Sequence, residues 1–220
     1  MKIVALSDTH NQHHVVSNWG WLPPADVLIH SGDISLRGTE GEVKEFFEWF
    51  FALEHYKHKI FIAGNHDFFF ERFPEKVKNT VFPENVHYLQ DSGIEIDGIH
   101  FWGSPIQPWF HNWAFNRDRG ADIRKHWDLI PANTNVLITH GPPYKILDEV
   151  MYASRHNPEM NVGCQDLTNK IAQLTDLKAV IFGHIHEGYG AVEQNGVKYF
   201  NASFIDIKYR PTNQPHVFEI

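Results

Sequence analysis

The sequence predicts an α/β fold in which short buried strands alternate with helices. Two observations indicate this: apolar, β-branched runs recur along the chain, and stretches with helical periodicity lie between them. Runs of four or five such residues are typical of strands buried on both faces, and their alternation with helices is typical of parallel sheets. The five runs are Lys2–Leu6, Val27–His30, Lys59–Ala63, Asn135–Thr139 and Ala179–Phe182.

Two helices are expected between these strands. The first spans Thr39–Tyr56, where Thr39 and Glu42 have the spacing of a capping box and apolar side chains recur with helical period. The second spans Cys164–Leu174, where the apolar side chains share one face.

Two hairpins add antiparallel strands, so the sheets are expected to be mixed. Ile94–Gly103 turns at Asp97-Gly98, and Ala191–Ser203 turns at Asn195-Gly196; both dipeptides favour a type I′ turn. A last strand is expected at His216–Ile220.

The aromatic-rich stretch Ser104–Asp128 has no clean period. We interpret it as a long loop with one helical turn or more, overhanging a site. Trp109 and Trp113 within it are interpreted as packing residues, with an aromatic lid over a nucleotide as the alternative.

The length of 220 residues fits one globular domain, spanning residues 1–220. Lysine and arginine number 19 against 27 aspartates and glutamates, so the net charge of −8 disfavours nucleic acid and anionic membranes as partners. The single cysteine, the lack of an apolar run long enough to span a membrane, and a start without a signal-peptide core predict a cytoplasmic protein. No feature of the sequence indicates an oligomeric state.

Each of the five predicted strands is followed at once by a short polar segment. Those segments are Ser7–His10, Ser31–Ile34, Gly64–Asp67, Thr139–Pro143 and Gly183–His186. Because parallel strands present their carboxyl ends at one edge of a sheet, we expect the polar side chains of these segments to converge in a single pocket. The side chains are those of Asp8, His10, Asp33, Asn65, His66, His140, His184 and His186.

Any one of these segments has an ordinary structural explanation, but oxygen and imidazole ligands at all five strand ends predict a metal site. Imidazole, carboxylate and amide groups without thiolate suit Mn²⁺, Fe²⁺, Ni²⁺ or Zn²⁺. Seven candidate ligands exceed the four of a tetrahedral zinc site but suit two ions that share one carboxylate. Such a pair would attract a phosphate ester and acidify a bound water, which predicts in-line attack on phosphorus by a metal-bound hydroxide.

The order SDTH, GDI, GNHD, THGPP and GHIH resembles the signature of the calcineurin-like metallophosphoesterase superfamily, and the matching motifs run from Ser7 to Ser203. Longer strings such as SDTHNQHH, VGC, GHIHEGYG and NAS resemble the small branch that includes the vertebrate metallophosphoesterase-domain-containing proteins of brain. The resemblance implies a four-layer α/β/β/α sandwich of two mixed β-sheets and a hydrolase with a binuclear metal centre.

The resemblance also implies a role for each matching residue. The implied ligands of one ion are Asp8, His10 and His186, those of the other are Asn65, His140 and His184, and Asp33 bridges the two. By the same resemblance His66 is not a ligand but contacts the phosphate and protonates the leaving oxygen, while Asp67 orients its ring. Mn²⁺ is the first choice of metal, with Fe, Zn, Ni and Mg as alternatives.

The expected activity is phosphodiester hydrolysis, with cyclic nucleotides the substrate class that the branch implies. Two alternatives stay open: a phosphomonoesterase or nucleotidase of the same fold, and a nucleotide-binding scaffold with little turnover. The complete ligand set and His66 favour an enzyme over a scaffold. The expected partner is a small phosphate ester, nucleotides included, rather than nucleic acid or a membrane.

Overall fold

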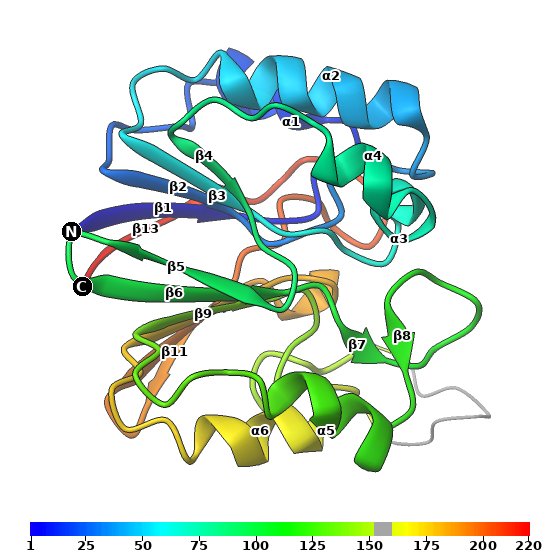
Figure 1. Ribbon diagram of the computed structural model, residues 1–220, viewed down its shortest axis with the longest axis vertical. Helices are drawn as coiled ribbons and strands as arrows, with labels where there is room; N and C mark the ends of the chain where they lie inside the picture. Colours follow the sequence, from blue (N-terminus) through cyan, green and yellow to red (C-terminus); the bar gives the residue numbers. More distant parts are fainter. Residues whose placement is uncertain (152–159) are drawn as a thin grey trace.

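Two β-sheets pack face to face in the computed structural model, which describes residues 1–151 and 160–220 (Figure 1). The first sheet has the strand order β13-β1-β2-β3-β4. Its strands are β1 (Lys2–Leu6), β2 (Val27–His30), β3 (His58–Phe61), β4 (Val86–Tyr88) and β13 (His216–Glu219). Strands β1 to β4 are parallel and β13 is antiparallel to β1, so the sheet is mixed as expected.

The second sheet has the order β11-β12-β10-β9-β6-β5. Its strands are β5 (Ser92–Ile96), β6 (Ile99–Ser104), β9 (Val136–Thr139), β10 (Ala179–Phe182), β11 (Gly190–Gln194) and β12 (Val197–Asn201). The two outer strands are antiparallel to their neighbours because each belongs to a predicted hairpin. Both central turn residues have positive φ in each hairpin, as the type I′ turn requires: 50° and 77° at Asp97-Gly98, and 54° and 77° at Asn195-Gly196.

Helices cover the outer face of each sheet, which completes the four predicted layers (Figure 1). Helices α1 (His13–Asn18) and α2 (Glu40–Phe51) lie over the first sheet, and α5 (Ala121–Trp127) and α6 (Gln165–Ile171) lie over the second. Two further short helices, α3 (Phe68–Arg72) and α4 (Pro74–Lys78), follow β3.

The predicted capping box begins α2: the backbone N–H of Glu42 donates to Thr39 Oγ1 at 3.3 Å, and the N–H of Thr39 donates to Glu42 Oε2 at 2.8 Å. The helix ends at Phe51 rather than at the predicted Tyr56. The buried side chain of Lys59 on β3 donates to the Phe51 carbonyl at 2.9 Å, so a tertiary contact satisfies the C-terminus at this point.

Alternate side chains of the central strands enter two different cores. Ile3 and Ala5 of β1 pack between the sheets, together with Ile138 of β9, whereas Val4 and Leu6 face the helices. All five side chains are fully buried, which explains why these strands are continuous apolar runs rather than alternating ones.

The stretch predicted as a loop at 104–128 contains more regular structure than expected. It holds the short parallel pair β7 (Gln107–Pro108) and β8 (Asn116–Arg117), followed by α5. Two-residue strands leave no periodicity for a sequence pattern to detect.

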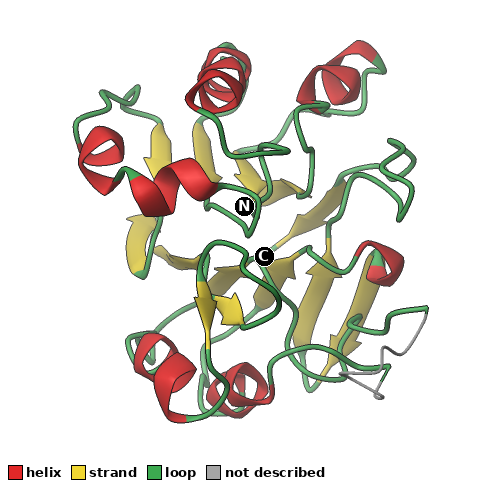
Figure 2. Ribbon diagram, turned by 90° about the vertical axis from the view of Figure 1, so that its right-hand side faces the viewer, coloured by secondary structure: helices red, strands yellow, loops and turns green. Residues whose placement is uncertain are grey.

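The two sheets join where their parallel strands end. The backbone N–H of Ser7, after β1, donates to the Ala202 carbonyl at 2.8 Å, and the N–H of Phe204, after β12, donates to the Ser7 carbonyl at 2.8 Å. Figure 2 views the molecule from this side. The carboxyl ends of strands from both sheets therefore meet at one place, which brings the polar segments after them together.

Candidate metal centre

The predicted site residues do meet at this junction. Seven of them are buried: Asp8, His10, Asp33, Asn65, His66, Asp67 and His140. His184 and His186 are half-buried and face them from the segment after β10. Contacts described below join all nine into one cluster, although they come from parts of the chain separated by up to 178 positions (8 to 186).

The first predicted ligand group is assembled from both sheets. One ligand atom each of Asp8, His10 and His186 lies within 4.8 Å of the others, and Asp8 Oδ1 is 3.5 Å from His186 Nε2. Asp8 Oδ2 accepts a hydrogen bond from Ser203 Oγ at 2.9 Å and from the backbone N–H of His184 at 3.0 Å. The same N–H also reaches Asp8 Oδ1 at 3.1 Å, so the protein holds the carboxylate in place while Oδ1 faces the histidine.

The second predicted group gathers around the side-chain oxygen of Asn65. His140 Nε2 lies 2.9 Å from Asn65 Oδ1, and His184 Nδ1 lies 2.7 Å from the same atom. An amide oxygen and two imidazole nitrogens are a donor set that borderline divalent ions accept.

Asp33 lies between the two groups. Its Oδ2 is 3.6 Å from His10 Nε2 in the first group and 3.4 Å from His140 Nε2 in the second. Its Oδ1 accepts the backbone N–H of His66 at 2.8 Å. One oxygen of Asp33 is thus engaged by the chain, and the other faces a histidine of each group, which is the position of a bridging carboxylate.

The hydrogen bonds of three histidines fit a bound cation. The Nδ1 atoms of His10, His140 and His186 lie 3.2, 3.0 and 3.2 Å from the carbonyl oxygens of Ser35, Ser31 and Asp206. A carbonyl only accepts, so each Nδ1 carries the proton and, in the neutral ring, each Nε2 offers a lone pair. Those Nε2 atoms face carboxylate oxygens, which also offer lone pairs. Divalent ions placed among these atoms would accept the lone pairs of both the imidazole nitrogens and the carboxylate oxygens.

The buried Nε2 of His10 is the most direct evidence that the cluster fits a bound cation. It has no hydrogen-bond partner among the residues that the structure describes, although a buried ring nitrogen normally has one. Its 3.6 Å separation from Asp33 Oδ2 exceeds the length of a charge-assisted hydrogen bond, about 2.7–2.9 Å. The residues present therefore fit a metal that binds between them.

The backbone is strained where it presents the ligands. Asp8, His10, Asp33 and His184 have φ values of 54°, 39°, 53° and 68°, in the left-handed region that residues other than glycine seldom adopt. Such strain persists where the surrounding structure enforces it and is concentrated at functional sites. At Gly183 the reason for glycine is close approach, because a Cβ there would overlap the side chains of Ser7 and Asp8.

Charge, not burial alone, sets the acidity of the two aspartates. Burial would raise the pKa of both, but the hydrogen bond and charge of His186 hold the pKa of Asp8 below its ordinary value. For Asp33 the charges of His140 and then His66 outweigh burial and lower its pKa well below the ordinary value. Both carboxylates are therefore ionised at neutral pH, as metal ligands must be.

The histidines divide into two classes. Burial lowers the pKa of His10 to about 4 and that of His184 to about 3. Burial would also lower the pKa of His140, but the charge of Asp33 raises it to about 9, and the hydrogen bond and charge of Asp8 raise that of His186. A metal ion bound at His140 would therefore displace a proton.

His66 lies beside the ligands, but Asp67 does not orient its ring as predicted. The ring Nδ1 lies 2.7 Å from the Leu36 carbonyl, which is its hydrogen-bond partner. Asp67 instead accepts the backbone N–H groups of Ile34, Ser35 and Gly64 at 3.2, 3.0 and 2.7 Å. Asp67 thus fixes the loop that carries Asp33, and Leu36 holds the ring.

Several contributors to the cluster were not predicted from the sequence, among them the Leu36 and Asp206 carbonyls and the Ser203 hydroxyl. A backbone carbonyl is common to every residue, so no residue type could have indicated the first two. Ser203 lies in the NAS string, which carried part of the family resemblance, and that is the one signal that pointed to it.

Aromatic side chains border the cluster. Trp113 stacks on His66 with ring centroids 4.2 Å apart, and Phe110 lies edge-on to His184 at 5.3 Å. Tyr209, which the sequence did not single out, lies 5.1 Å from His10 and 5.6 Å from His186. The 104–128 stretch thus reaches the site. The prediction that Trp109 is a packing residue is wrong, because 58% of its surface is exposed.

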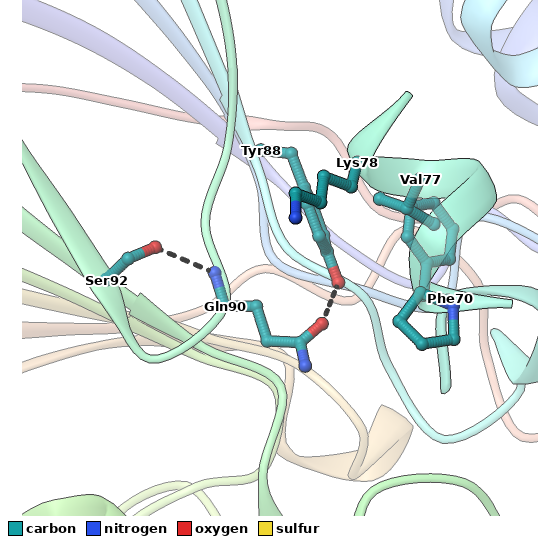
Figure 3. A pocket seen from close by; sticks show the side chains of 7 residues that line it. Phe70, Val77, Lys78, Tyr88, Gln90 and Ser92 are labelled. Atoms are coloured by element: carbon teal, nitrogen blue, oxygen red, sulfur yellow. Dashed lines mark hydrogen bonds between the residues drawn. The ribbon is translucent and has the colours of Figure 1, made fainter. Parts of the chain in front are cut away.

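Two hollows are lined by residues other than the predicted ligands. One, of about 250 Å³, lies between α4 and the strands β4 and β5; Tyr88 donates there to Gln90 Oε1 at 2.7 Å (Figure 3). The other, of about 320 Å³, is lined in part by Lys145, Asp148 and Glu187. Neither contains a predicted ligand.

In the part of the chain that the structure describes, no helix is both long and apolar enough to cross a bilayer.

Comparison with known proteins agrees with the geometry. Residues 1–188 match the family model described as calcineurin-like phosphoesterase. Metallophosphoesterase domain-containing protein 1 of Homo sapiens is 37% identical over 240 aligned positions, which cover 100% of this chain and 71% of that protein. A probable glycerophosphodiester phosphodiesterase, GpdQ, of Arcobacter nitrofigilis is 28% identical over 167 positions, covering 74% of this chain and 58% of that protein.

A solved structure supports the fold. The phosphopantetheinyl hydrolase of Mycobacterium tuberculosis superposes with a TM-score of 0.61, at 14% identity, over 94% of this chain and 90% of that one. The family match and the human relative extend over most of the chain. The chain therefore belongs to the calcineurin-like phosphoesterase family, with the hydrolase-type function and divalent-metal binding of that family.

Proposed function

We propose that the chain is a phosphodiesterase that works with two divalent ions held by the two ligand groups. The observation that carries the proposal is the position of Asp33, whose Oδ2 faces His10 at 3.6 Å and His140 at 3.4 Å. A carboxylate oxygen between two sets of ligands is the arrangement that paired ions require. The first ion would be held by Asp8, His10 and His186, and the second by Asn65, His140 and His184.

When bound, such ions act as Lewis acids that acidify a water and neutralise charge on the phosphoryl oxygens. We take Mn²⁺ as the first choice, because the donor set contains imidazole, carboxylate and amide oxygen but no thiolate. Fe, Zn, Ni and Mg are the alternatives to be compared with it.

His66 would supply the proton for the leaving oxygen. A ring nitrogen of His66 lies within 4.8 Å of a carboxylate oxygen of Asp33 and of a ring nitrogen of His10, so the ring is at the cluster, and the two proposed ligand groups are complete without it. Its Nδ1–H is held by the Leu36 carbonyl at 2.7 Å, which leaves Nε2 to carry and release a proton. Trp113 stacks on the ring and restricts its movement.

A diester is favoured over a monoester by charge. A diester carries one negative charge near neutrality, and a second charge on a monoester calls for additional cations. In the loop that carries Tyr209 beside His10 and His186, the guanidinium of Arg210 is already engaged by the carboxylate of Asp206. The name of the Arcobacter relative also supports diester chemistry. Cyclic nucleotides are the diesters to test first, in keeping with a cytoplasmic location.

The test is to remove divalent ions with a chelator, restore Mn²⁺, and measure hydrolysis of bis(4-nitrophenyl) phosphate against 4-nitrophenyl phosphate. The two esters share a leaving group, so they compare diester with monoester directly. We expect metal-dependent turnover with a higher kcat/KM for the diester. A higher kcat/KM for the monoester would favour the phosphomonoesterase, and metal binding without turnover of either would favour the scaffold.

A further inference from the structure

Tyr209 is an exposed aromatic residue held beside the first ligand group. Its ring centroid lies 5.1 Å from that of His10 and 5.6 Å from that of His186, yet 43% of its surface is accessible. Its φ is +59°, a conformation that a bulky residue rarely adopts. A tyrosine that only filled the core would be buried and would not require a backbone with positive φ.

Asp206 builds the loop that presents Tyr209. Its Oδ1 accepts the backbone N–H groups of Lys208 and Arg210 at 2.8 and 3.0 Å, and its Oδ2 accepts the Arg210 guanidinium at Nε, 2.8 Å away. The backbone N–H of Tyr209 donates to the Asp206 carbonyl at 2.8 Å. That same carbonyl holds His186 Nδ1 at 3.2 Å, so the loop is tied directly to a predicted ligand.

A second contact fixes the loop from the other side. Gln12, after the first ligand segment, donates through Nε2 to the Tyr209 carbonyl at 3.0 Å. The backbone that carries the ring is therefore fixed by several independent hydrogen bonds, which is how a rigid contact surface for a ligand is built.

The rim on the side of the second ligand group is also apolar. Phe110 and Leu36 are 37% and 40% exposed, Phe110 contacts His184, and the Leu36 carbonyl holds His66. Tyr209 and Phe110 thus place aromatic surface beside histidines of both ligand groups. Aromatic surface next to an anion site fits an ester whose organic group is itself aromatic.

We propose that Tyr209 contacts the substrate and selects phosphodiesters that carry an aromatic or heteroaromatic group next to the phosphate. This inference rests on the proposed phosphodiesterase function. The ring provides the contact, and the Asp206–Arg210 loop holds it in place.

The experiment compares two diesters with the same leaving group, methyl 4-nitrophenyl phosphate and bis(4-nitrophenyl) phosphate. They differ in the group that stays on phosphorus, which is methyl in one and aryl in the other. The aryl-to-methyl ratio of kcat/KM is measured in the wild type and in each variant, so that the intrinsic reactivity of the esters cancels.

In Tyr209→Leu, which keeps a Cβ at the strained position, we expect this ratio to fall by about tenfold, the size of one lost aromatic contact. Tyr209→Phe keeps the ring and should retain the wild-type ratio within about twofold. The matched control is Phe73→Leu, because Phe73 is 46% exposed and its ring contacts Phe69 and Lys76 rather than the cluster.

An unchanged ratio in an active Tyr209→Leu enzyme overturns the inference and leaves the phosphodiesterase standing. An equal fall in Phe73→Leu overturns it as well. If the wild type hydrolyses neither diester with any of the metals, the proposed function fails and the inference fails with it. A measurement on the wild type alone guards against misfolding of the variant: phenyl phosphate should inhibit more strongly than methyl phosphate, and equal inhibition contradicts the proposal.

Discussion

The backbone N–H of His66 donates to Asp33 Oδ1 at 2.8 Å, which ties the candidate proton donor to the candidate bridging carboxylate. This hydrogen bond therefore holds the loop after β3 in a fixed position relative to the loop after β2. Any movement of the carboxylate also moves the imidazole, so a substitution at Asp33 should affect both the metals and the proton transfer.

Asp33→Asn should cost more activity than the loss of any one terminal ligand. The amide removes the charge that faces both ligand groups, so both sites weaken together. We expect kcat/KM to fall by about 10³-fold or more and metal content to drop below two ions per chain. His186→Ala, which removes one ligand of one group, is the comparison. An Asp33→Asn protein with full metal content and a near-normal rate would contradict the bridging role.

His66→Ala should keep both ions, because the ring is not needed by either ligand group. Its rate should fall by about 10²–10⁴-fold for esters with poor leaving groups and by less for activated ones, since a good leaving group needs no proton. The measurement is a series of aryl esters whose phenols differ in pKa. Equal slowing across the series would show that His66 does not act as the acid.

Ser203→Ala should weaken metal binding without changing a ligand. The Ser203 hydroxyl donates to Asp8 Oδ2 at 2.9 Å and so fixes the carboxylate of the first group. Loss of such a supporting hydrogen bond typically costs about 10–100-fold in metal affinity, which a chelator competition assay measures. Ser92→Ala is the matched control, because the Ser92 hydroxyl accepts the backbone N–H of Gln90 rather than supporting Asp8, so its loss should leave the affinity unchanged.

The buried ring of His13 should make the fold sensitive to acid. Burial and then the charge of His14 lower the pKa of His13 from 6.5 to about 3, so the unfolded chain takes up a proton that the folded chain refuses. Stability is complete above pH 6.5 and falls as the pH decreases towards 3. Between pH 7 and pH 5 this residue alone should cost about 2 kcal/mol.

His13→Leu removes that titration while keeping an apolar side chain against Trp49 and Phe46, which the His13 ring contacts at 5.0 and 5.8 Å. Urea unfolding of the metal-free protein at pH 7 and pH 5 measures the difference. The variant should lose less stability than the wild type over this interval. An identical loss in both proteins would show that His13 is already protonated in the folded state.

The strand ends and the residues that gather at the candidate site could be predicted from residue type and position: only a few residue types bind metals, and Asp8, His10 and His140 follow closely after apolar runs. The hairpin turns could be predicted because Asp97-Gly98 and Asn195-Gly196 are among the few pairs that tolerate two positive φ values.

The groups that hold the candidate ligands in place, or lie beside them, could not be predicted in the same way. The carbonyls of Leu36 and Asp206 act through the backbone, and Asp67 acts on the loop of Asp33 rather than on the adjacent His66. Tyr209 reaches the cluster from a loop beyond the last motif, and only the fold of that loop reveals it. Tertiary contacts, not local pattern, determine these positions.

The measurement that tests the central claim most directly is a titration of the metal-free protein with Mn²⁺, in which bound ions and phosphodiester turnover are followed together. The shared position of Asp33 predicts that turnover rises with the second ion and reaches its plateau at two bound ions per chain. Full turnover at one ion per chain, or two bound ions without turnover, would contradict the two-metal phosphodiesterase.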